Sequence, residues 1–241
     1  MPYSKVLCMD YKPLFEHLIK NKVNIDLIYT DPPYLIEKIS GGGSINTIKR
    51  FRDSLESLES NNIIDSYDMG TFAEQVCRLQ KDINVYFWCN KKQIPLYFDI
   101  YVNQLKCKFD ILFWGKTNPL PTYSNKYLTD VEYCLYFRKG GSHCKPECYQ
   151  DAFTYYIEPI NAKDKKLWEH PTIKPLECVK KHIRNSSRAG ELVLDPFLGS
   201  GTTGVACKEL NRNFIGCDIN ERWARIAERR IVETNLGVLL C

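Results

Sequence analysis

Short apolar runs alternate with amphipathic stretches along most of this chain. The runs are rich in β-branched and aromatic residues, which favour strands, whereas the stretches between them repeat their apolar residues at the helical period. We expect strands at residues 5–9, 23–29, 84–88, 109–114, 131–137, 191–195 and 213–217. We expect helices at residues 13–20, 69–81, 92–105, 175–187, 203–210 and 220–235.

This alternation of strand and helix predicts an α/β fold. Chains of this kind form a mostly parallel sheet with helices on both faces. The strands 109–114 and 131–137 are separated by the break Asn118–Pro121 and not by a helix, so we expect them to pair as an antiparallel edge. Residues 1–241 suit a single domain with inserted segments, and no second domain is indicated.

The first candidate for chemistry is the sequence Asp31-Pro32-Pro33-Tyr34. It follows the expected strand 23–29, and open α/β sheets place ligand sites at the carboxyl ends of their strands. Two consecutive prolines fix two φ angles and remove two N–H donors, so Asp31 and the Pro32 carbonyl form a rigid cluster of acceptors beside the Tyr34 ring. Such a cluster suits an exocyclic amino group on a planar base. A surface turn also uses Pro and Asp, so the tetrapeptide alone leaves both interpretations open.

A second candidate is the predicted unit of strand, glycine-rich turn and helix at residues 191–210. Gly199 and Gly201 let the backbone turn sharply and approach a ligand closely, and the next helix presents free N–H groups there. The following strand ends at Asp218, 19 residues after Gly199. At this spacing a Rossmann-like unit places a carboxylate on ribose hydroxyls.

Together the two motifs resemble those of DNA amino-methyltransferases that use S-adenosyl-L-methionine. Asp31-Pro32-Pro33-Tyr34 is similar to the catalytic motif of that family, and Asp195-Pro196-Phe197-Leu198-Gly199-Ser200-Gly201-Thr202-Thr203-Gly204 is similar to its cofactor motif. The catalytic motif comes first here, as in the permuted class called beta. The resemblance extends from Val6 to Ile231 and implies a Rossmann-like domain with a seven-stranded sheet.

The resemblance implies methyl transfer to an amino nitrogen of a base that has flipped out of double-stranded DNA. The catalytic residues would be Asp31, Pro32, Pro33 and Tyr34, with Tyr34 stacked on the base. In the family, Asp at the first motif position is usual for adenine N6 and Ser for cytosine N4. Asp31 therefore favours adenine N6, and cytosine N4 stays the alternative.

The resemblance also implies a set of cofactor contacts. The segment 170–175, His-Pro-Thr-Ile-Lys-Pro, is similar to a family element whose Thr and Lys lie at the carboxylate end of the cofactor. Asp10, at a predicted strand end, would meet the adenine ring of the cofactor, cap the next helix, or do both. The expected cofactor residues are Asp10, Asp31, Thr172, Lys174, Asp195, Pro196, Phe197, Gly199, Ser200, Gly201, Thr202, Asp218 and Ile219.

Three segments are candidates for contact with DNA. Residues 35–67 are long for a connection and are expected to form a mobile flap over cofactor and DNA, although a plain disordered insertion fits the same pattern. The loop between strands 109–114 and 131–137 is polar, basic and aromatic. Residues 138–169 fall where the family has its target-recognition region, in a short form. The candidate DNA-binding residues are Lys49, Arg50, Arg52, Lys116, Asn118, Tyr123, Asn125 and Lys126.

The expected partners follow from the same resemblance. Because segment 138–169 is short, we expect further base contacts from the flap, the hairpin loop or a second subunit, and the permuted class often forms homodimers. A cognate restriction endonuclease is the other partner that the resemblance implies. The net charge of +4 neither demands nor excludes nucleic acid.

The sequence also indicates where the protein is expected to be located and whether it is expected to bind a metal. No stretch approaches the roughly 20 apolar residues of a membrane span, and the N-terminus lacks the apolar region of a signal peptide, so we expect a cytoplasmic protein without membrane contact. Eleven scattered cysteines indicate reduced thiols and not a disulfide framework. His143, Cys144 and Cys148 lack a second pair of ligands, so no metal site is predicted.

Three rival functions explain less of the sequence. Enzymes that methylate RNA or a protein glutamine more often have Asn at the position of Asp31. A non-catalytic partner subunit should show losses in the catalytic or glycine motif, and both are intact. A nicotinamide oxidoreductase would use a glycine turn of different spacing and would leave Asp31-Pro32-Pro33-Tyr34 unexplained.

Overall fold

A computed structural model describes residues 2–34, 67–121, 127–160, 162–168 and 173–234. The elements in these ranges are β1 Ser4–Cys8, α1 Tyr11–Lys20, β2 Leu27–Thr30, α3 Met69–Leu79, β3 Asn84–Cys89, α4 Gln93–Tyr97, the π-helix η1 Phe98–Gln104, β4 Lys108–Gly115, β5 Val131–Arg138, the 3₁₀ turn η2 Gln150–Ala152, β6 Tyr155–Ile157, α5 Ala162–Trp168, α6 Leu176–Ser186, β7 Leu192–Asp195, α7 Thr202–Glu209, β8 Asn213–Asp218 and α8 Glu221–Glu233. No helix in these ranges is long and apolar enough to cross a membrane.

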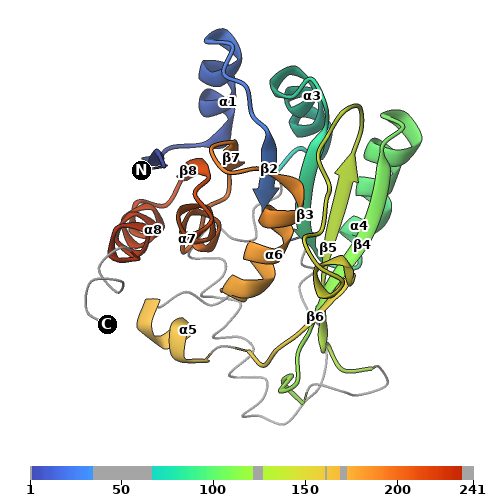
Figure 1. The fold of residues 1–241 in the computed structure, drawn as a ribbon, viewed down its shortest axis with the longest axis vertical. Helices are drawn as coiled ribbons and strands as arrows, with labels where there is room; N and C mark the ends of the chain where they lie inside the picture. The colour runs from blue at the N-terminus through green and yellow to red at the C-terminus, as the bar shows by residue number, and fades with distance from the viewer. Residues whose placement is uncertain (1, 35–66, 122–126, 161, 169–172, 235–241) are drawn as a thin grey trace.

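The strands form one sheet in the order β1-β8-β7-β2-β3-β5-β4-β6 (Figure 1). Seven of these eight described strands run in the same direction, and only β5 is antiparallel to its neighbours β3 and β4. The predicted α/β fold with a mostly parallel sheet and an antiparallel part is therefore confirmed. The sheet has one strand more than expected, because β6 pairs in parallel with β4 and forms the outer edge beyond the predicted hairpin.

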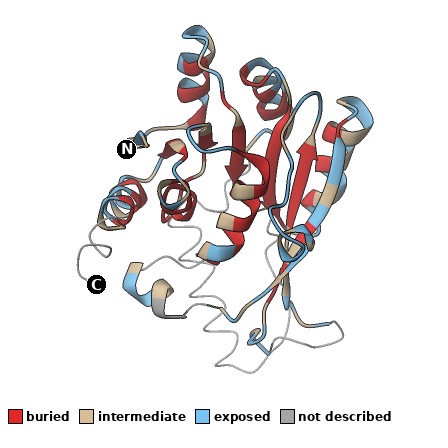
Figure 2. Ribbon diagram, viewed as in Figure 1, coloured by how far each residue is buried: buried red, intermediate tan, exposed pale blue. Residues whose placement is uncertain are grey.

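Helices cover both faces of the sheet and enclose two apolar cores (Figure 2). α1, α3, α4 and η1 supply side chains to one core, and α6, α7 and α8 supply them to the other. The central strands feed both cores in alternation: Val85 and Phe87 of β3 face the first, while Tyr86 and Trp88 face the second. Burial on both faces explains why the sequences of β2 and β3 are almost continuously apolar.

Two predicted segments differ in detail from the structure. The expected helix 92–105 is present, but its second half is the π-helix η1, in which Tyr101 stacks on Phe137 of β5 with ring centroids 4.8 Å apart. Segment 138–169, in which no strand or helix was predicted, contributes the edge strand β6 and the helix α5. A strand of three residues is too short to show a period, so the sequence pattern did not indicate β6.

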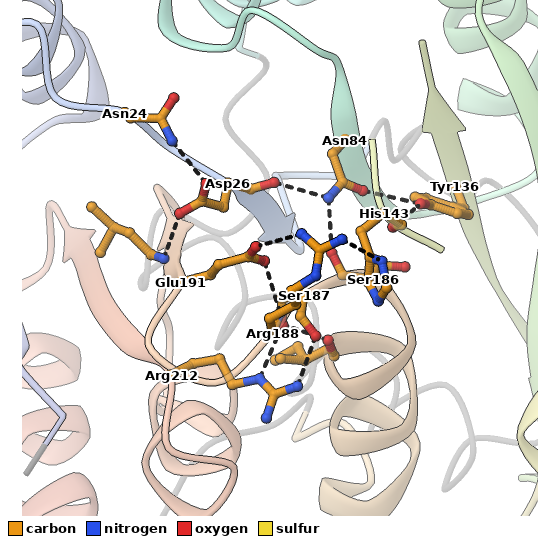
Figure 3. Close-up of polar contacts among 12 residues, drawn as sticks. Asn24, Asp26, Asn84, Tyr136, His143, Ser186, Ser187, Arg188, Glu191 and Arg212 are labelled. Atoms are coloured by element: carbon orange, nitrogen blue, oxygen red, sulfur yellow. Dashed lines mark hydrogen bonds and ion pairs between the residues drawn. The ribbon is translucent and has the colours of Figure 1, made fainter. Parts of the chain in front are cut away.

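A polar network fastens the sheet at the amino ends of β2 and β3 (Figure 3). Buried Asn84 donates from Nδ2 to the carbonyls of Asp26 and Ser186, both at 2.8 Å, and accepts from the Tyr136 hydroxyl at 3.0 Å. Arg212 extends the network by donating to the Ser187 carbonyl at 2.7 Å. One amide side chain thus joins β3 to the start of β2, the end of α6 and β5.

The substitution Asn84→Ala tests this network. It leaves one buried and one partly buried carbonyl without their donor, and each unsatisfied buried group costs about 1–3 kcal/mol, so we expect the free energy of unfolding in urea to fall by about 2–4 kcal/mol. Asn103→Ala on the exposed side of η1 is the control, since it removes only a surface hydrogen bond to Asp99 and should change stability by less than about 0.5 kcal/mol. Equal stability of the two variants would contradict the assignment.

Candidate active site

The predicted catalytic loop, residues 31–34, begins directly after β2 in the middle of the sheet. Gln93, buried at the start of α4, donates from Nε2 to the Pro33 carbonyl at 2.9 Å and so anchors the loop to the helix that follows β3. The Oδ1 atom of Asp31 is buried and has no hydrogen-bond partner among the described residues. The loop therefore presents a fixed and unsatisfied acceptor.

Four charged side chains, Asp31, Lys174, Glu132 and Lys116, form an ionic group that we call the Asp31 cluster. Lys174 Nζ lies 2.6 Å from Asp31 Oδ2 and 3.0 Å from Glu132 Oε2, and it donates to the Tyr34 hydroxyl at 3.0 Å. Lys116 Nζ lies 2.7 Å from the other Glu132 oxygen. Two carboxylates and two ammonium groups thus alternate beside the catalytic loop.

Burial and charge shift the pKa values in the Asp31 cluster. Burial raises the pKa of Asp31 above its usual value, although the nearby Lys174 charge works in the opposite direction. Burial would also raise the pKa of Glu132, but Lys174 and Lys116 outweigh it and bring that pKa to about 2. Burial lowers the pKa of Lys174, but Asp31 and Glu132 outweigh it and hold that pKa well above normal. Glu132 and Lys174 are therefore charged at neutral pH.

Aromatic rings enclose the Lys174 ammonium group. Its Nζ lies 5.1 Å from the centre of the Trp88 ring and 5.4 Å from that of Tyr34, within the range of a cation–π attraction. Hydrogen bonds also hold Trp88 in place. Its Nε1 donates to the Tyr29 hydroxyl at 3.0 Å, and that hydroxyl oxygen lies 3.1 Å from Nδ1 of buried His182. The two rings help to fix the Lys174 ammonium group, whose side chain is only 6% exposed.

The buried carboxylate of Asp195 joins the two sequence motifs. Its Oδ1 accepts from the Thr30 hydroxyl at 2.9 Å and from the Phe197 N–H at 3.1 Å, and its Oδ2 accepts from the Thr203 hydroxyl at 2.6 Å. Burial raises the pKa of Asp195 to about 7, although the three hydrogen bonds oppose that rise. Because Thr30 precedes Asp31 directly, this carboxylate sets the distance between the catalytic loop and the glycine loop.

The glycine loop turns as the sequence predicts. Gly199 and Gly201 have φ values of 51° and 82°, which L side chains rarely adopt. A Cβ on Gly201 would lie 2.8 Å from the Cα of Ala227 in α8. Asp218, at the end of β8, accepts from the Gly199 N–H at 2.9 Å and from the Asn220 N–H at 2.8 Å, so its carboxylate lies against the glycine loop.

A buried arginine that the sequence analysis did not single out supports the glycine loop. Arg230 of α8 donates from one guanidinium nitrogen to the carbonyl and hydroxyl of Ser200, at 3.3 and 3.2 Å, and to the Thr202 hydroxyl at 2.9 Å. The ring of Trp168 in α5 lies 5.8 Å from the guanidinium carbon. The sequence feature that could have identified Arg230 is its position on the apolar face of the helix predicted at residues 220–235.

Two predicted DNA-binding residues have partners within the protein. Lys116 is paired with Glu132 and not directed outward, and the side-chain oxygen of Asn118 accepts from the Ile160 N–H at 2.6 Å. Glu132, a lone acid in a predicted apolar strand, was missed by the sequence analysis. The predicted residues that lie outside the described ranges are Lys49, Arg50, Arg52, Tyr123, Asn125, Lys126 and Thr172.

The remaining predicted cofactor residues surround the glycine loop. Asp10 caps α1 by accepting from the Lys12 N–H at 2.8 Å. It follows β1, whose last residue pairs in register with Asp218 of β8. Ile219 is 58% exposed, so an apolar side chain lies open to solvent beside the Asp218 carboxylate. The Pro196 carbonyl accepts a hydrogen bond from the buried Cys217 thiol.

Known proteins match most of this sequence. The DNA methylase family (N6/N4 methyltransferases) matches residues 25–229. The Type II methyltransferase M2.DpnII of Streptococcus pneumoniae is 31% identical over 243 residues, covering 92% of this chain and 88% of that protein.

Two solved structures share the fold. The complex of M1.HpyAVI with SAM has a TM-score of 0.69 at 24% identity, covering 94% of this chain and 98% of that one. The PvuII DNA methyltransferase, described as cytosine-N4-specific, has a TM-score of 0.63 at 15% identity, covering 99% of this chain and 93% of that one. The family match and the sequence relative cover most of the described site, and the chain belongs to the DNA methylase family of N6/N4 methyltransferases.

Proposed function

We propose that this chain transfers a methyl group from S-adenosyl-L-methionine to the N6 amino group of adenine in double-stranded DNA. The observation that carries the proposal is the position of Asp31. Its carboxylate lies at the carboxyl end of β2, next to Thr30, whose hydroxyl donates to Asp195 at the start of the glycine loop. An acceptor for an amino group thus adjoins the loop assigned to the cofactor.

The residues at the glycine loop fit S-adenosyl-L-methionine. The left-handed turns at Gly199 and Gly201 keep side chains away from the loop backbone, the partly exposed Asp218 carboxylate suits ribose hydroxyls, and Ile219 offers an apolar surface for a base. Asp10 adds an acceptor beside them. When bound, the cofactor supplies the methyl group as an electrophile, because its sulfonium sulfur leaves with the electron pair of the carbon–sulfur bond.

The acceptors of the catalytic loop make the amino nitrogen of the base more nucleophilic. An exocyclic amine is a weak nucleophile because its lone pair is delocalised into the ring. Hydrogen bonds from its two hydrogens to the Asp31 carboxylate and the Pro32 carbonyl favour a pyramidal nitrogen with a localised lone pair. Such acceptors act most strongly when they are preorganised in a dry site, and the two prolines and the Gln93 hydrogen bond provide that order.

The proton that the nitrogen loses needs no strong base. Once the methyl group has been transferred, the nitrogen is cationic and its hydrogen is acidic, so Asp31 or water can take it. The target nitrogen is unreachable inside a duplex, so the base must flip out, and Tyr34 would stack on it. The contact between the Tyr34 hydroxyl and Lys174 holds that ring in place.

The choice of adenine over cytosine rests on Asp31 at the first motif position. The sequence relative is named a Type II methyltransferase, a term for modification enzymes of restriction–modification systems, so a cognate restriction endonuclease belongs to the proposal. The homodimer, the cytoplasmic location and the recognition role of residues 138–169 stay predictions from the sequence.

A transfer assay tests the proposed function. Labelled S-adenosyl-L-methionine is incubated with the protein and mixed duplex DNA, and the digested nucleosides are identified by mass analysis. We expect N6-methyladenine. Detection of N4-methylcytosine would be consistent with the proposed mechanism but would refute adenine as the target base. A protein that binds the cofactor without methylating any DNA would contradict the proposal.

Arg230→Met tests the support of the glycine loop. Loss of the guanidinium removes a buried donor from Ser200 and Thr202, so we expect the Kd for S-adenosylhomocysteine in calorimetry to rise about ten-fold, or ~1.4 kcal/mol. Arg229→Met is the matched control on the same helix, because Arg229 has a 70% exposed side chain paired with Glu233, and we expect no more than about a two-fold change. Equal Kd values for the two variants would refute this role.

A further inference from the structure

Glu132 reaches the active site through the one reversed strand of the sheet. β5 is antiparallel to β3, so the start of β5 lies beside the end of β3, with Tyr133 paired to Cys89. Glu132 adjoins this position, and its side chain is only 22% exposed. A parallel strand would have placed its first residues at the opposite end of the sheet, away from Asp31.

The ammonium group of Lys174 has three oxygen neighbours, of which the Tyr34 hydroxyl accepts a hydrogen bond and the two carboxylate oxygens form ion pairs. They are Asp31 Oδ2, Glu132 Oε2 and the Tyr34 hydroxyl, at 2.6, 3.0 and 3.0 Å. Lys174 is only 6% exposed, so water competes little for these contacts. The positive charge nearest to Asp31 is therefore shared between two carboxylates.

This sharing bears on the proposed reaction, on which the inference rests. Positive charge develops on the amino nitrogen as the methyl group is transferred, and an acceptor stabilises that charge best when it keeps its full negative charge. A lysine paired with Asp31 alone would weaken it as an acceptor and would repel the charge that develops. The geometry points to Glu132 as a positioning residue that shares the charge of Lys174 with Asp31 and so keeps Asp31 an effective acceptor for the target amine.

The other charged and titratable groups around Asp31 are consistent with this role. Those that act on Asp31 from its own loop and from the neighbouring elements are Lys174, Glu132, Tyr34, Cys89, Cys134 and Asp195. Lys116 and the partly buried Lys165 of α5 act on Glu132. The negative charge of Glu132 raises the pKa of Asp31, whereas Lys174 lowers it, so loss of Glu132 should lower the pKa of Asp31.

The test substitutes Glu132→Gln and reads Asp31 directly. Aspartate labelled with ¹³C at the carboxyl is titrated by NMR in the protein without cofactor or DNA, and Asp31→Asn identifies the Asp31 signal. We expect Asp31 to titrate at lower pH in Glu132→Gln than in the unsubstituted protein. We also expect kcat for methyl transfer to fall at least ten-fold and its acid limb to move to lower pH, while the Kd values for DNA and S-adenosylhomocysteine change less than three-fold.

Two further variants separate positioning from a merely structural role. Asp110→Asn is the matched control, because Asp110 is an acid of the same hairpin that pairs with Arg138 and has no contact with Lys174 among the described residues; it should leave the Asp31 titration unchanged. The double variant Glu132→Gln, Lys116→Met removes a charge of each sign, so it should move the titration of Asp31 back toward that of the unsubstituted protein. If Glu132→Gln alone does not fold, comparison of the double variant with Lys116→Met carries the test, because the two differ only in Glu132, and Asp31 should titrate at lower pH in the double variant.

The outcomes distinguish this inference from the proposed function. An Asp31 titration that does not move in Glu132→Gln, or that moves equally in Asp110→Asn, overturns the role of Glu132 even if the protein methylates DNA. A shift to lower pH supports the role of Glu132 at Asp31 even if the transfer assay finds a substrate other than adenine.

Discussion

The hydrogen bond from Thr30 to Asp195 holds the site together. It joins residues 165 positions apart in the sequence. Thr30 directly precedes the catalytic loop, and Asp195 directly precedes the glycine loop. The Asp195 carboxylate also accepts hydrogen bonds from Phe197 and Thr203, so a single buried side chain fixes the glycine loop to the catalytic loop. Methyl transfer depends on exact placement of the reacting atoms, and this contact sets the distance between the two loops that provide it.

The two ends of the sheet carry different polar groups. At the amino ends of β2 and β3, the neutral side chain of Asn84 donates to backbone carbonyls and joins strands to α6. At the carboxyl ends lies the Asp31 cluster, which is charged and includes a buried acceptor without a partner among the described residues. The first arrangement stabilises the fold. The second leaves Asp31 Oδ1 without a donor from the described part of the protein, so that it can accept a hydrogen bond from a substrate.

The pattern of the sequence predicted most of the fold because the central strands are buried on both faces, which makes them continuous apolar runs. The sequence also predicted the glycine turn, and the structure places Asp218 against it through the Gly199 N–H. The strand β6 was not predictable from three residues. Asp195 was expected at the cofactor, but its carboxylate is occupied by three donors from the protein.

The contacts that the sequence pattern did not predict depend on packing between distant segments. Lys174 was predicted to contact the cofactor, and in the structure it forms an ion pair with Asp31. Lys116 was predicted to contact DNA, and in the structure it forms an ion pair with Glu132. Glu132 and Arg230 carry no local motif, since each acquires its role only when β5 or α8 packs against another element. The pattern of the chain gives the position of a strand, but not which charged groups meet at its end.

The most direct test of the account is the single-turnover rate of methyl transfer by Asp31→Ala. The acceptor cluster predicts a fall of at least about a hundred-fold, with the Kd for S-adenosylhomocysteine largely unchanged. A variant that binds the cofactor and methylates DNA at the full rate would contradict the account, because the chemistry would then not need the carboxylate around which the site is built.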